Sequence, residues 1–334
     1  MSTLTAPSDS GKRDGRPSAA RQSAASIIDV ALRYAPVIVL VVLLIVATIL
    51  VGDFWAIGNL KNIVSQNTPI GLVAIAVTVI IITANFDLSV GAIFAAGAVF
   101  YASVADEWPL EIGLIATLGV GAMFGAINGL IVTRLGVNSL IATLGTGAAF
   151  SGVTYLYCNN SAIQVNVSGF DGLGLGEIAG IPWTGVVLFA AFVIVGVILA
   201  RSVYGRRVYA VGGSAEAARL AGMRVNAIIV SAFVLVGLAS AFGGAILASQ
   251  IGVGQPTIGT TTALDAFAIV VIGGTSIYGG EGAIWRTATG LAILSVLSNV
   301  FNSLTLDPAV QSIAKGAILI AALGLDRLAQ RRRS

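Results

Sequence analysis

The sequence contains no histidine, one cysteine and only three lysines. Without histidine the chain cannot form a Ser-His-Asp triad, a histidine metal site or a histidine proton relay. Cys158 alone cannot form an intrachain disulfide or a cysteine metal cluster. The phosphate-binding pattern G-x-x-x-x-G-K-[ST] is absent too, so any ATP chemistry must come from a partner. We therefore expect no catalytic residue, no metal and no cofactor in this chain, which is not an enzyme by itself.

Charged residues are also scarce. They make up 10% of the 334 residues, against 57% hydrophobic residues, and the mean hydropathy is +0.96. A soluble globular protein contains about 25% charged residues. This composition indicates a polytopic protein surrounded by membrane lipid. The basic residues are scattered over loops and tails rather than gathered in a stripe, which argues against a nucleic-acid partner.

Apolar runs predict an all-α fold with about ten transmembrane helices, some of them short or broken. The runs cover about 37–52, 63–84, 90–105, 112–133, 138–157, 183–200, 227–249, 265–278, 287–304 and 310–325. The eighth run is short for the ~30 Å of hydrocarbon that a spanning helix must cross. Pro69 should kink or break the second. Gly121, Gly125 and Gly129 lie on one face of the fourth and predict close contact with another helix.

The chain divides into three parts. Residues 1–33 predict a flexible cytoplasmic tail, because they are polar and lack the apolar content to fold. Residues 34–328 form the transmembrane domain, and 329–334 form a basic cytoplasmic tail. Lys and Arg mark cytoplasmic loops, and an even number of spans places both termini on that side. The segments 106–111, 158–182 and 250–264 then lie outside, the last of them partly re-entrant.

The longest polar interval between spans is 201–226, which carries five of the eighteen basic residues. Gly212 and Gly213 predict a turn, and Ser214 predicts the cap of a following helix, because its hydroxyl can accept a bond from a first-turn amide. Residues 215–221 are good helix formers.

The charges and the glycine that follow support this short cytoplasmic helix. Glu216 suits its positive end, Arg219 suits its negative end, and Gly222 can adopt the left-handed conformation that closes a helix. About two turns are not stable alone in water. We expect this helix to pack on a separate protein, with a solvated connector as the plainer interpretation.

Polar residues within or beside the spans are candidates for a translocation path. They are Asp87, Ser89, Asn128, Thr143, Gln255 and Asp265. An intramembrane carboxylate is costly, so Asp87 and Asp265 should each cap a helix, find a partner or line a cavity. The uncharged residues suit a neutral polyhydroxylated solute, and equally suit hydrogen bonds between helices.

Five ordered blocks of sequence carry a family resemblance. They are 87–91 (DLSVG); 126–129 (AING), 132–135 (VTRL) and 141–146 (IATLGT); 204–206 (YGR), 210–213 (AVGG) and 216–222 (EAARLAG); 254–256 (GQP) and 264–266 (LDA); and 271–276 (VIGGTS) with 279–280 (GG). Over about 35–328 the chain resembles the permease subunit of bacterial ABC importers of the ribose or monosaccharide type. Asn85-Phe86 and Asn138-Ser139 depart from that family's usual residues.

The resemblance implies a complex in the bacterial inner membrane. Its other members are two ATP-binding subunits, a second permease subunit that forms a homodimer with the first, and a periplasmic or lipid-anchored solute-binding protein. The short helix would sit in a groove on the ATPase and couple its motion to the spans. The residues assigned to this coupling are Gly213, Ser214, Glu216, Ala217, Arg219, Leu220 and Gly222.

The function implied is ATP-driven import of a neutral sugar, a pentose, a hexose or a related polyol. Two alternatives remain open. The first is an ABC permease for branched-chain amino acids, and the second is an ion-coupled secondary transporter that uses Asp87 or Asp265.

Overall fold

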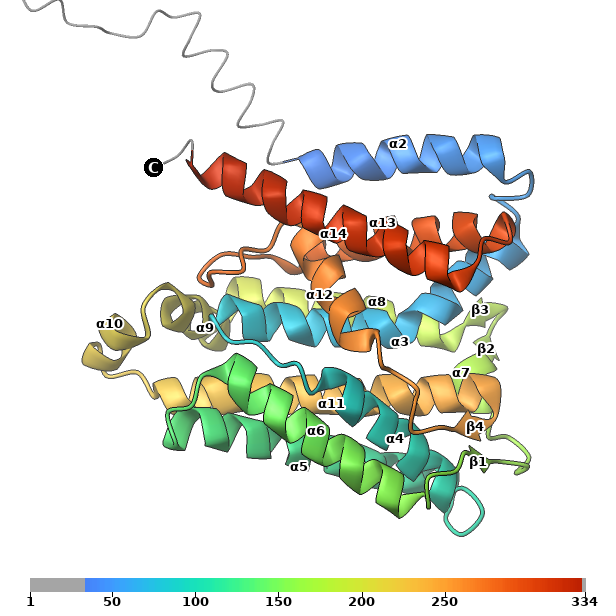
Figure 1. The fold of residues 1–334 in the computed structure, drawn as a ribbon, viewed down its shortest axis with the longest axis horizontal. Helices are drawn as coiled ribbons and strands as arrows, with labels where there is room; N and C mark the ends of the chain where they lie inside the picture. The colour runs from blue at the N-terminus through green and yellow to red at the C-terminus, as the bar shows by residue number, and fades with distance from the viewer. Residues whose placement is uncertain (1–33, 332–334) are drawn as a thin grey trace, which may run out of the picture. The chain divides into compact units, whose positions relative to one another are not determined.

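The computed structural model describes residues 34–331, apart from the side chains of residues 319 and 321–331. The predicted tail 1–33 and the last three residues of the predicted tail 329–334 lie outside this range. Most of the described part is helical (Figure 1). In chain order the elements are α2 (Ala35–Leu50), α3 (Ile57–Ile82), α4 (Val90–Val104), α5 (Leu110–Arg134), α6 (Ser139–Tyr157), β1 (Ile163–Gln164), α7 (Gly172–Leu175), β2 (Glu177–Ile178), β3 (Ile181–Pro182), α8 (Trp183–Arg201), α9 (Val203–Gly213), α10 (Ala215–Leu220), α11 (Val225–Ile251), β4 (Val253–Gly254), α12 (Thr262–Ile272), α13 (Ile284–Ser303) and α14 (Pro308–Arg331).

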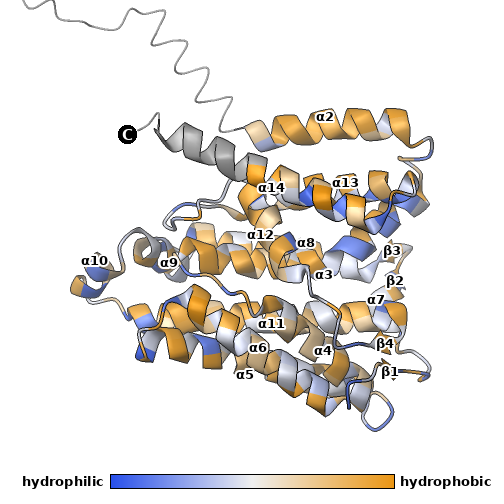
Figure 2. Cartoon of the chain, in the orientation of Figure 1, coloured by the Kyte–Doolittle hydropathy of each residue, from blue (hydrophilic) through white to orange (hydrophobic). Residues whose placement is uncertain are grey.

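Six of these helices are long and apolar enough to cross a membrane, namely α3, α5, α6, α8, α11 and α13, and three shorter apolar helices accompany them. Figure 2 shows apolar residues over the helix surfaces, whereas hydrophilic residues gather on α10 and in loops. Large side chains such as Phe189 and Val197 of α8 are exposed. Water disfavours such a surface and lipid accepts it. The predicted class, a helical multi-pass membrane protein, is confirmed at this level.

Helix α11 packs along α5, α4 and α3. Its contact with α5 depends on the glycines that recur at every fourth residue of α5. A side chain at Gly121 would overlap the carbonyl of Gly237, and one at Gly125 would overlap the carbonyl of Phe233. Gly129 continues the same face against α11. The predicted close helix contact is confirmed, because the two backbones leave no room for a Cβ atom.

Helix α3 continues through Pro69 without interruption, so the break allowed for at this proline is not found. Proline has no amide hydrogen, which leaves the carbonyl four residues earlier without its helical partner. That carbonyl belongs to Ser65, and the side-chain amide of Gln250 in α11 donates to it at 2.9 Å. A residue of another helix thus replaces the missing bond.

Three predicted spans have wrong boundaries, and one of them is the tenth, expected over about 310–325, where α14 covers Pro308–Arg331. The second span was expected to begin near 63, and α3 begins at Ile57. The eighth was expected to cover 265–278, and α12 covers Thr262–Ile272. Gly274, Gly279 and Gly280 adopt positive φ in the segment that follows, 273–283, a conformation that a helix cannot continue through.

The segments predicted to lie outside meet at one end of the helices. Strand β1, from 158–182, pairs antiparallel with β4, from 250–264, so that Ile163 faces Gly254. The β2–β3 hairpin is tied to the start of α3 by an ion pair of 2.9 Å between Lys61 and Glu177. We call the end of the helices where these segments meet the acidic end. The charged residues in its loops and helix ends are Asp53, Lys61, Asp106, Glu107, Glu111, Asp171, Glu177 and Asp307.

The opposite end is formed by α9, α10, the loop 135–138 and the segment 273–283. We call it the basic end. Its charged residues are Arg134, Arg201, Arg206, Arg207, Glu216, Arg219, Arg224, Glu281 and Arg286. The two ends therefore differ strongly in the sign of their charge.

Candidate functional site

Helix α10 has both of the caps that the sequence predicts. The hydroxyl of Ser214 accepts a hydrogen bond from the amide of Ala217 at 3.1 Å. Gly222 adopts a φ of +79°, and the amide of Met223 donates back to the carbonyl of Ala218 at 3.0 Å. This closure is the one that a left-handed glycine provides at a helix end. The helix was expected over 215–221 and covers Ala215–Leu220.

The surface of α10 is almost entirely exposed. Ala218 is its one buried residue and faces the apolar core of the chain. Glu216, Arg219 and Leu220 point away from that core, and Leu220 is 85% exposed. Figure 1 shows α10 projecting beyond the neighbouring helices. All seven residues assigned to coupling therefore lie in α10 or within two residues of its ends. They are Gly213, Ser214, Glu216, Ala217, Arg219, Leu220 and Gly222.

The turn predicted at Gly212-Gly213 is not found, since both residues end the helix α9. Gly212 is needed for close packing instead of for a turn. A Cβ atom there would overlap the carbonyl of Ile82, at the end of α3, and would lie 2.6 Å from the amide nitrogen of Gly280. That amide donates to the Ile82 carbonyl at 2.9 Å. The backbones of α9, α3 and the segment 273–283 therefore meet at Gly212.

Two tyrosines fasten α9 further. The hydroxyl of Tyr209 donates to the carbonyl of Gly282 at 2.8 Å, and that of Tyr204 lies 2.9 Å from the hydroxyl of Ser231 in α11. Burial raises the pKa of both Tyr204 and Tyr209 above that of free tyrosine. These two hydroxyls join α9 to the segment 273–283 and to α11.

Asp87, Ser89, Asn128 and Thr143 come together where the segment 83–89 joins α3 to α4. Asp87 is fully buried, and its Oδ1 accepts from the amide and the hydroxyl of Ser89 at 2.9 and 2.6 Å. The side-chain amide of Asn128, in α5, donates to Asp87 Oδ2 at 3.3 Å and to Ser89 Oγ at 2.7 Å. Asp87 thus accepts from the amide of Ser89, the residue that precedes α4, and no side chain caps α4 itself, so the capping role expected for Asp87 is not found.

Helix α6 holds the same segment from the other side. Thr143 Oγ1 accepts from the amide of Leu88 at 3.0 Å, and Ser139 Oγ accepts from the amide of Phe86 at 3.1 Å. The two family departures, at 85–86 and 138–139, therefore touch each other. Asn128 Oδ1 is buried without a hydrogen-bond partner in the described part of the chain. This group clamps a connecting segment by bonds from two helices, α5 and α6.

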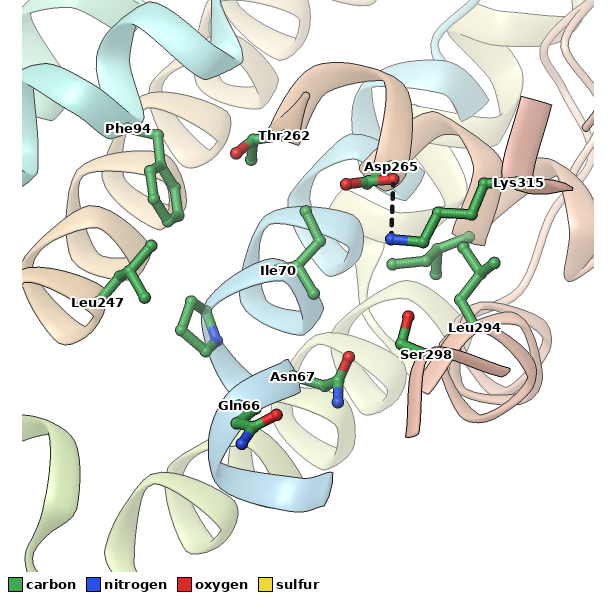
Figure 3. Close-up of a pocket in the computed structure, with 12 residues that line it drawn as sticks. Gln66, Asn67, Ile70, Phe94, Leu247, Thr262, Asp265, Leu294, Ser298 and Lys315 are labelled. Atoms are coloured by element: carbon green, nitrogen blue, oxygen red, sulfur yellow. Dashed lines mark ion pairs between the residues drawn. The ribbon is translucent and has the colours of Figure 1, made fainter. Parts of the chain in front are cut away.

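Gln255 and Asp265 lie apart from that clamp. Gln255 is exposed beside Pro256, which borders a cavity of about 300 Å³ between α4, α6 and the segment 256–263. Asp265 lines a different cavity of about 180 Å³, where it faces Lys315 of α14 (Figure 3). The atoms Lys315 Nζ and Asp265 Oδ1 are 3.7 Å apart. The six predicted path residues therefore occupy three places.

Comparison with known proteins now identifies the class. Residues 59–323 match the family model described as branched-chain amino acid transport system / permease component. The chain belongs to this permease family. The ribose import permease proteins RbsC of Escherichia coli (strain K12) and Bacillus subtilis (strain 168) are 36% and 38% identical to this permease. Those matches cover 88% and 87% of this chain and 93% and 92% of the relatives.

A third relative of the permease carries a different sugar in its name. The L-arabinose transport system permease protein AraH of Escherichia coli (strain K12) is 34% identical, with 90% of this chain and 92% of the relative covered. No solved structure matches the chain significantly. The resemblance drawn from the sequence blocks is confirmed.

Sequence reasoning missed part of the permease's cavity at Asp265. Gln66, Asn67 and Ser298 also line it, and Lys315 supplies its cation. A usable signal was present for Lys315, because a single lysine inside an apolar run is costly in a membrane and therefore marks a functional site by default. Gln66 and Asn67 lie one turn or less before Pro69, in a span whose polar residues were not considered.

Proposed function

We propose that the chain is the membrane-spanning permease subunit of an ATP-driven importer that carries a neutral sugar across the bacterial inner membrane. The observation that carries this proposal is α10, a doubly capped helix that projects from the basic end with Leu220 almost fully exposed. The chain's family is that of a transport-system permease component, and relatives covered over nearly their whole length are named for ribose and L-arabinose.

Ten helices make up the membrane domain in this proposal, namely α2 to α6, α8 and α11 to α14, and the 11 residues of α12 cover only part of the bilayer thickness. The basic end faces the cytoplasm, because Lys and Arg are retained on that side of a bilayer. Both termini then lie in the cytoplasm. The acidic end faces outward, where a periplasmic or lipid-anchored solute-binding protein would dock.

An ATP-binding subunit takes α10 into a groove, and a second copy of the chain with its own ATPase completes the complex. The contacts of α9 explain how force would reach the spans. The side chain of Ala218 packs α10 against the apolar core. Gly212 contacts the last residue of α3, and the hydroxyl of Tyr209 donates a hydrogen bond to the segment that leads into α13. Close-packed interiors transmit displacement instead of absorbing it, so motion of α10 would move the ends of α3 and α13.

The test is sugar-stimulated ATPase activity and ATP-dependent uptake of D-ribose and L-arabinose in proteoliposomes holding the assembled complex. Gly222→Ala places a side chain at a φ of +79° and Gly180→Ala one at +77°, and neither Cβ atom would meet another atom within 4 Å. The strain is about 1–2 kcal/mol in both. We expect Gly222→Ala to reduce coupling several-fold and Gly180→Ala, in the β2–β3 hairpin, to leave it intact. Equal coupling in the two variants, with normal assembly, would contradict the docking role.

A second candidate cargo is a branched-chain amino acid, which the description of the matched family favours. Uptake of L-leucine in the same vesicles, with no uptake of either sugar, would select it. Uptake driven by an ion gradient, without the ATPase subunits, would instead select a secondary transporter that uses Asp87 or Asp265.

A further inference from the structure

The cavity at Asp265 is built from six helices, α3, α4, α11, α12, α13 and α14, all of them apolar over most of their length. Its volume of about 180 Å³ compares with roughly 10–15 Å³, on the same measure, for the space that one water molecule needs. A solute of several non-hydrogen atoms therefore fits. Lys315 is seven residues into α14, about 10 Å along the helix from the acidic end. The cavity thus lies within the outer half of the proposed membrane domain.

The ion pair in this cavity is open. Lys315 Nζ and Asp265 Oδ1 are 3.7 Å apart, whereas a charge-assisted N–H···O bond measures about 2.7–2.9 Å. The other ion pair of the described residues, Lys61 with Glu177 at the acidic end, is closed at 2.9 Å. Asp265 Oδ2 receives only a 3.2 Å hydrogen bond from Thr261 Oγ1. Donor and acceptor capacity therefore remains free on both charged groups, and a hydroxyl group can bridge them.

Neutral polar groups and one aromatic ring complete the lining. The amides of Gln66 and Asn67 come from α3, the hydroxyl of Ser298 comes from α13, and the ring of Phe94 comes from α4 (Figure 3). Amides and hydroxyls can both donate and accept, as sugar hydroxyls do. An aromatic face suits the C–H face of a sugar ring. The set carries no net charge, and its amides and hydroxyls match the hydroxyl groups of a neutral polyol.

We propose that this cavity is a transit site for a neutral monosaccharide, in which Asp265 accepts from and Lys315 donates to the sugar hydroxyls that enter between them. This inference rests on the proposed function and deepens it, since it names the residues that would hold the cargo inside the permease. The pair balances its own charge when the cavity is empty. A sugar replaces the long contact with two hydrogen bonds of ordinary length.

Cysteine protection tests occupancy directly. The background variant is Cys158→Ser, which removes the only cysteine. Ser298→Cys in this background places a thiol in the cavity, and Ser312→Cys places one on the exposed surface of α14, outside the cavity. The full-length permease in its complex is labelled with a small methanethiosulfonate reagent, with and without saturating D-ribose, L-arabinose or L-leucine.

We expect one of the two sugars to slow labelling of Ser298→Cys about tenfold and to leave Ser312→Cys unchanged, with no protection by L-leucine. Protection by L-leucine, or an unchanged rate with both sugars while the complex still imports one of them, would overturn the proposal. A complex that imports L-leucine and neither sugar would refute the proposed function itself, so the two failures are distinguishable.

Variants that change the charge of the Asp265–Lys315 pair distinguish a role in sugar binding from a purely structural role. Loss of a hydrogen bond to a charged group costs about 1.5–3 kcal/mol, or roughly ten- to a hundredfold in affinity. Asp265→Asn should therefore raise the KM for the transported sugar at least tenfold. The double variant Asp265→Asn with Lys315→Met has no net charge in the cavity. If the pair is only structural, the KM should return toward that of the unmodified protein, and if the pair binds the sugar, the KM should stay high. Recovery of KM in the double variant would refute a binding role.

Discussion

Substitution of Gly212 by alanine tests the junction that links α10 to the spans. The added Cβ atom would overlap the carbonyl of Ile82 and lie 2.6 Å from the amide nitrogen of Gly280. Both atoms belong to backbone, so no flexible side chain can move aside. Either α9 retreats from α3, or the 2.9 Å hydrogen bond between Gly280 and Ile82 breaks.

The expected cost follows from these two routes. Overpacking of a filled interior costs about 1–3 kcal/mol. A buried carbonyl or amide left without its partner costs about 1–3 kcal/mol. We expect Gly212→Ala to lose roughly 1–3 kcal/mol of local stability by either route, and to reduce ATPase coupling in the complex because α10 changes its position.

The matched control is the next residue. A Cβ atom at Gly213 meets nothing within 4 Å, and Gly213 lies in the same helix. Alanine is a better helix former than glycine by about 1 kcal/mol, so Gly213→Ala should be neutral or slightly stabilising. Thermal unfolding of the purified full-length protein in detergent is the readout for this pair, because Gly213 is itself assigned to coupling. Equal unfolding temperatures in the two variants would refute this account of the junction.

Two further substitutions test the interior. Gln250→Leu removes the donor that serves the Ser65 carbonyl and should lower the free energy of unfolding by about 1–3 kcal/mol. In a Pro69→Ala background, which restores the backbone donor, the same change should cost much less. An equal cost in the two backgrounds would contradict the explanation. Asp87→Asn should keep most of the clamp, because its carbonyl still accepts from Ser89, although rotation of Asn128 to present Oδ1 to the new amide breaks the 2.7 Å bond from Asn128 Nδ2 to Ser89 Oγ. Asp87→Ala should cost about 2–4 kcal/mol more than Asp87→Asn, and equal melting temperatures for the two would disprove the clamp.

Local features of the chain could be predicted from the sequence. Ser214 and Gly222 define α10 through bonds within a few residues of themselves, and the structure has both. The apolar runs likewise predicted the membrane class, because length and hydropathy are properties of each segment alone. The four-residue spacing of glycines in α5 was sufficient to predict a close helix contact, though not that α11 would be the partner.

Features that depend on distant residues could not be predicted in this way. Proline lacks a donor in any helix, and only the position of Gln250, far along the chain, explains why α3 continues. Gly212 and Gly213 have the composition of a turn, yet they complete α9 because the backbone of Ile82 requires a glycine beside it. Sequence alone does not distinguish a glycine that bends the chain from one that admits a neighbour.

The polar residues of the spans show the same limit. Each could be recognised because a polar side chain in a membrane span costs free energy, but the sequence did not show which of these residues would contact one another. Asp87 and Asn128 meet in the clamp, whereas Asp265 meets Lys315, fifty residues later, in a cavity. A buried carboxylate bonded only to neutral groups and one that faces an ammonium group across open space have different chemistry. Their shared residue type therefore did not predict a shared role.

Helix α3 connects the two ends of the proposed mechanism. Its last residue, Ile82, accepts from Gly280 and contacts Gly212 at the basic end. Asn67 lies fifteen residues earlier in the wall of the cavity at Asp265, about 22 Å away along the helix axis. If the carbonyl of Ser65 had no hydrogen-bond partner, α3 would bend near the cavity instead of moving as a rigid helix. The hydrogen bond from Gln250 to this carbonyl prevents such bending. Displacement of α9 by an ATPase would then reach the wall of the cavity through one uninterrupted element.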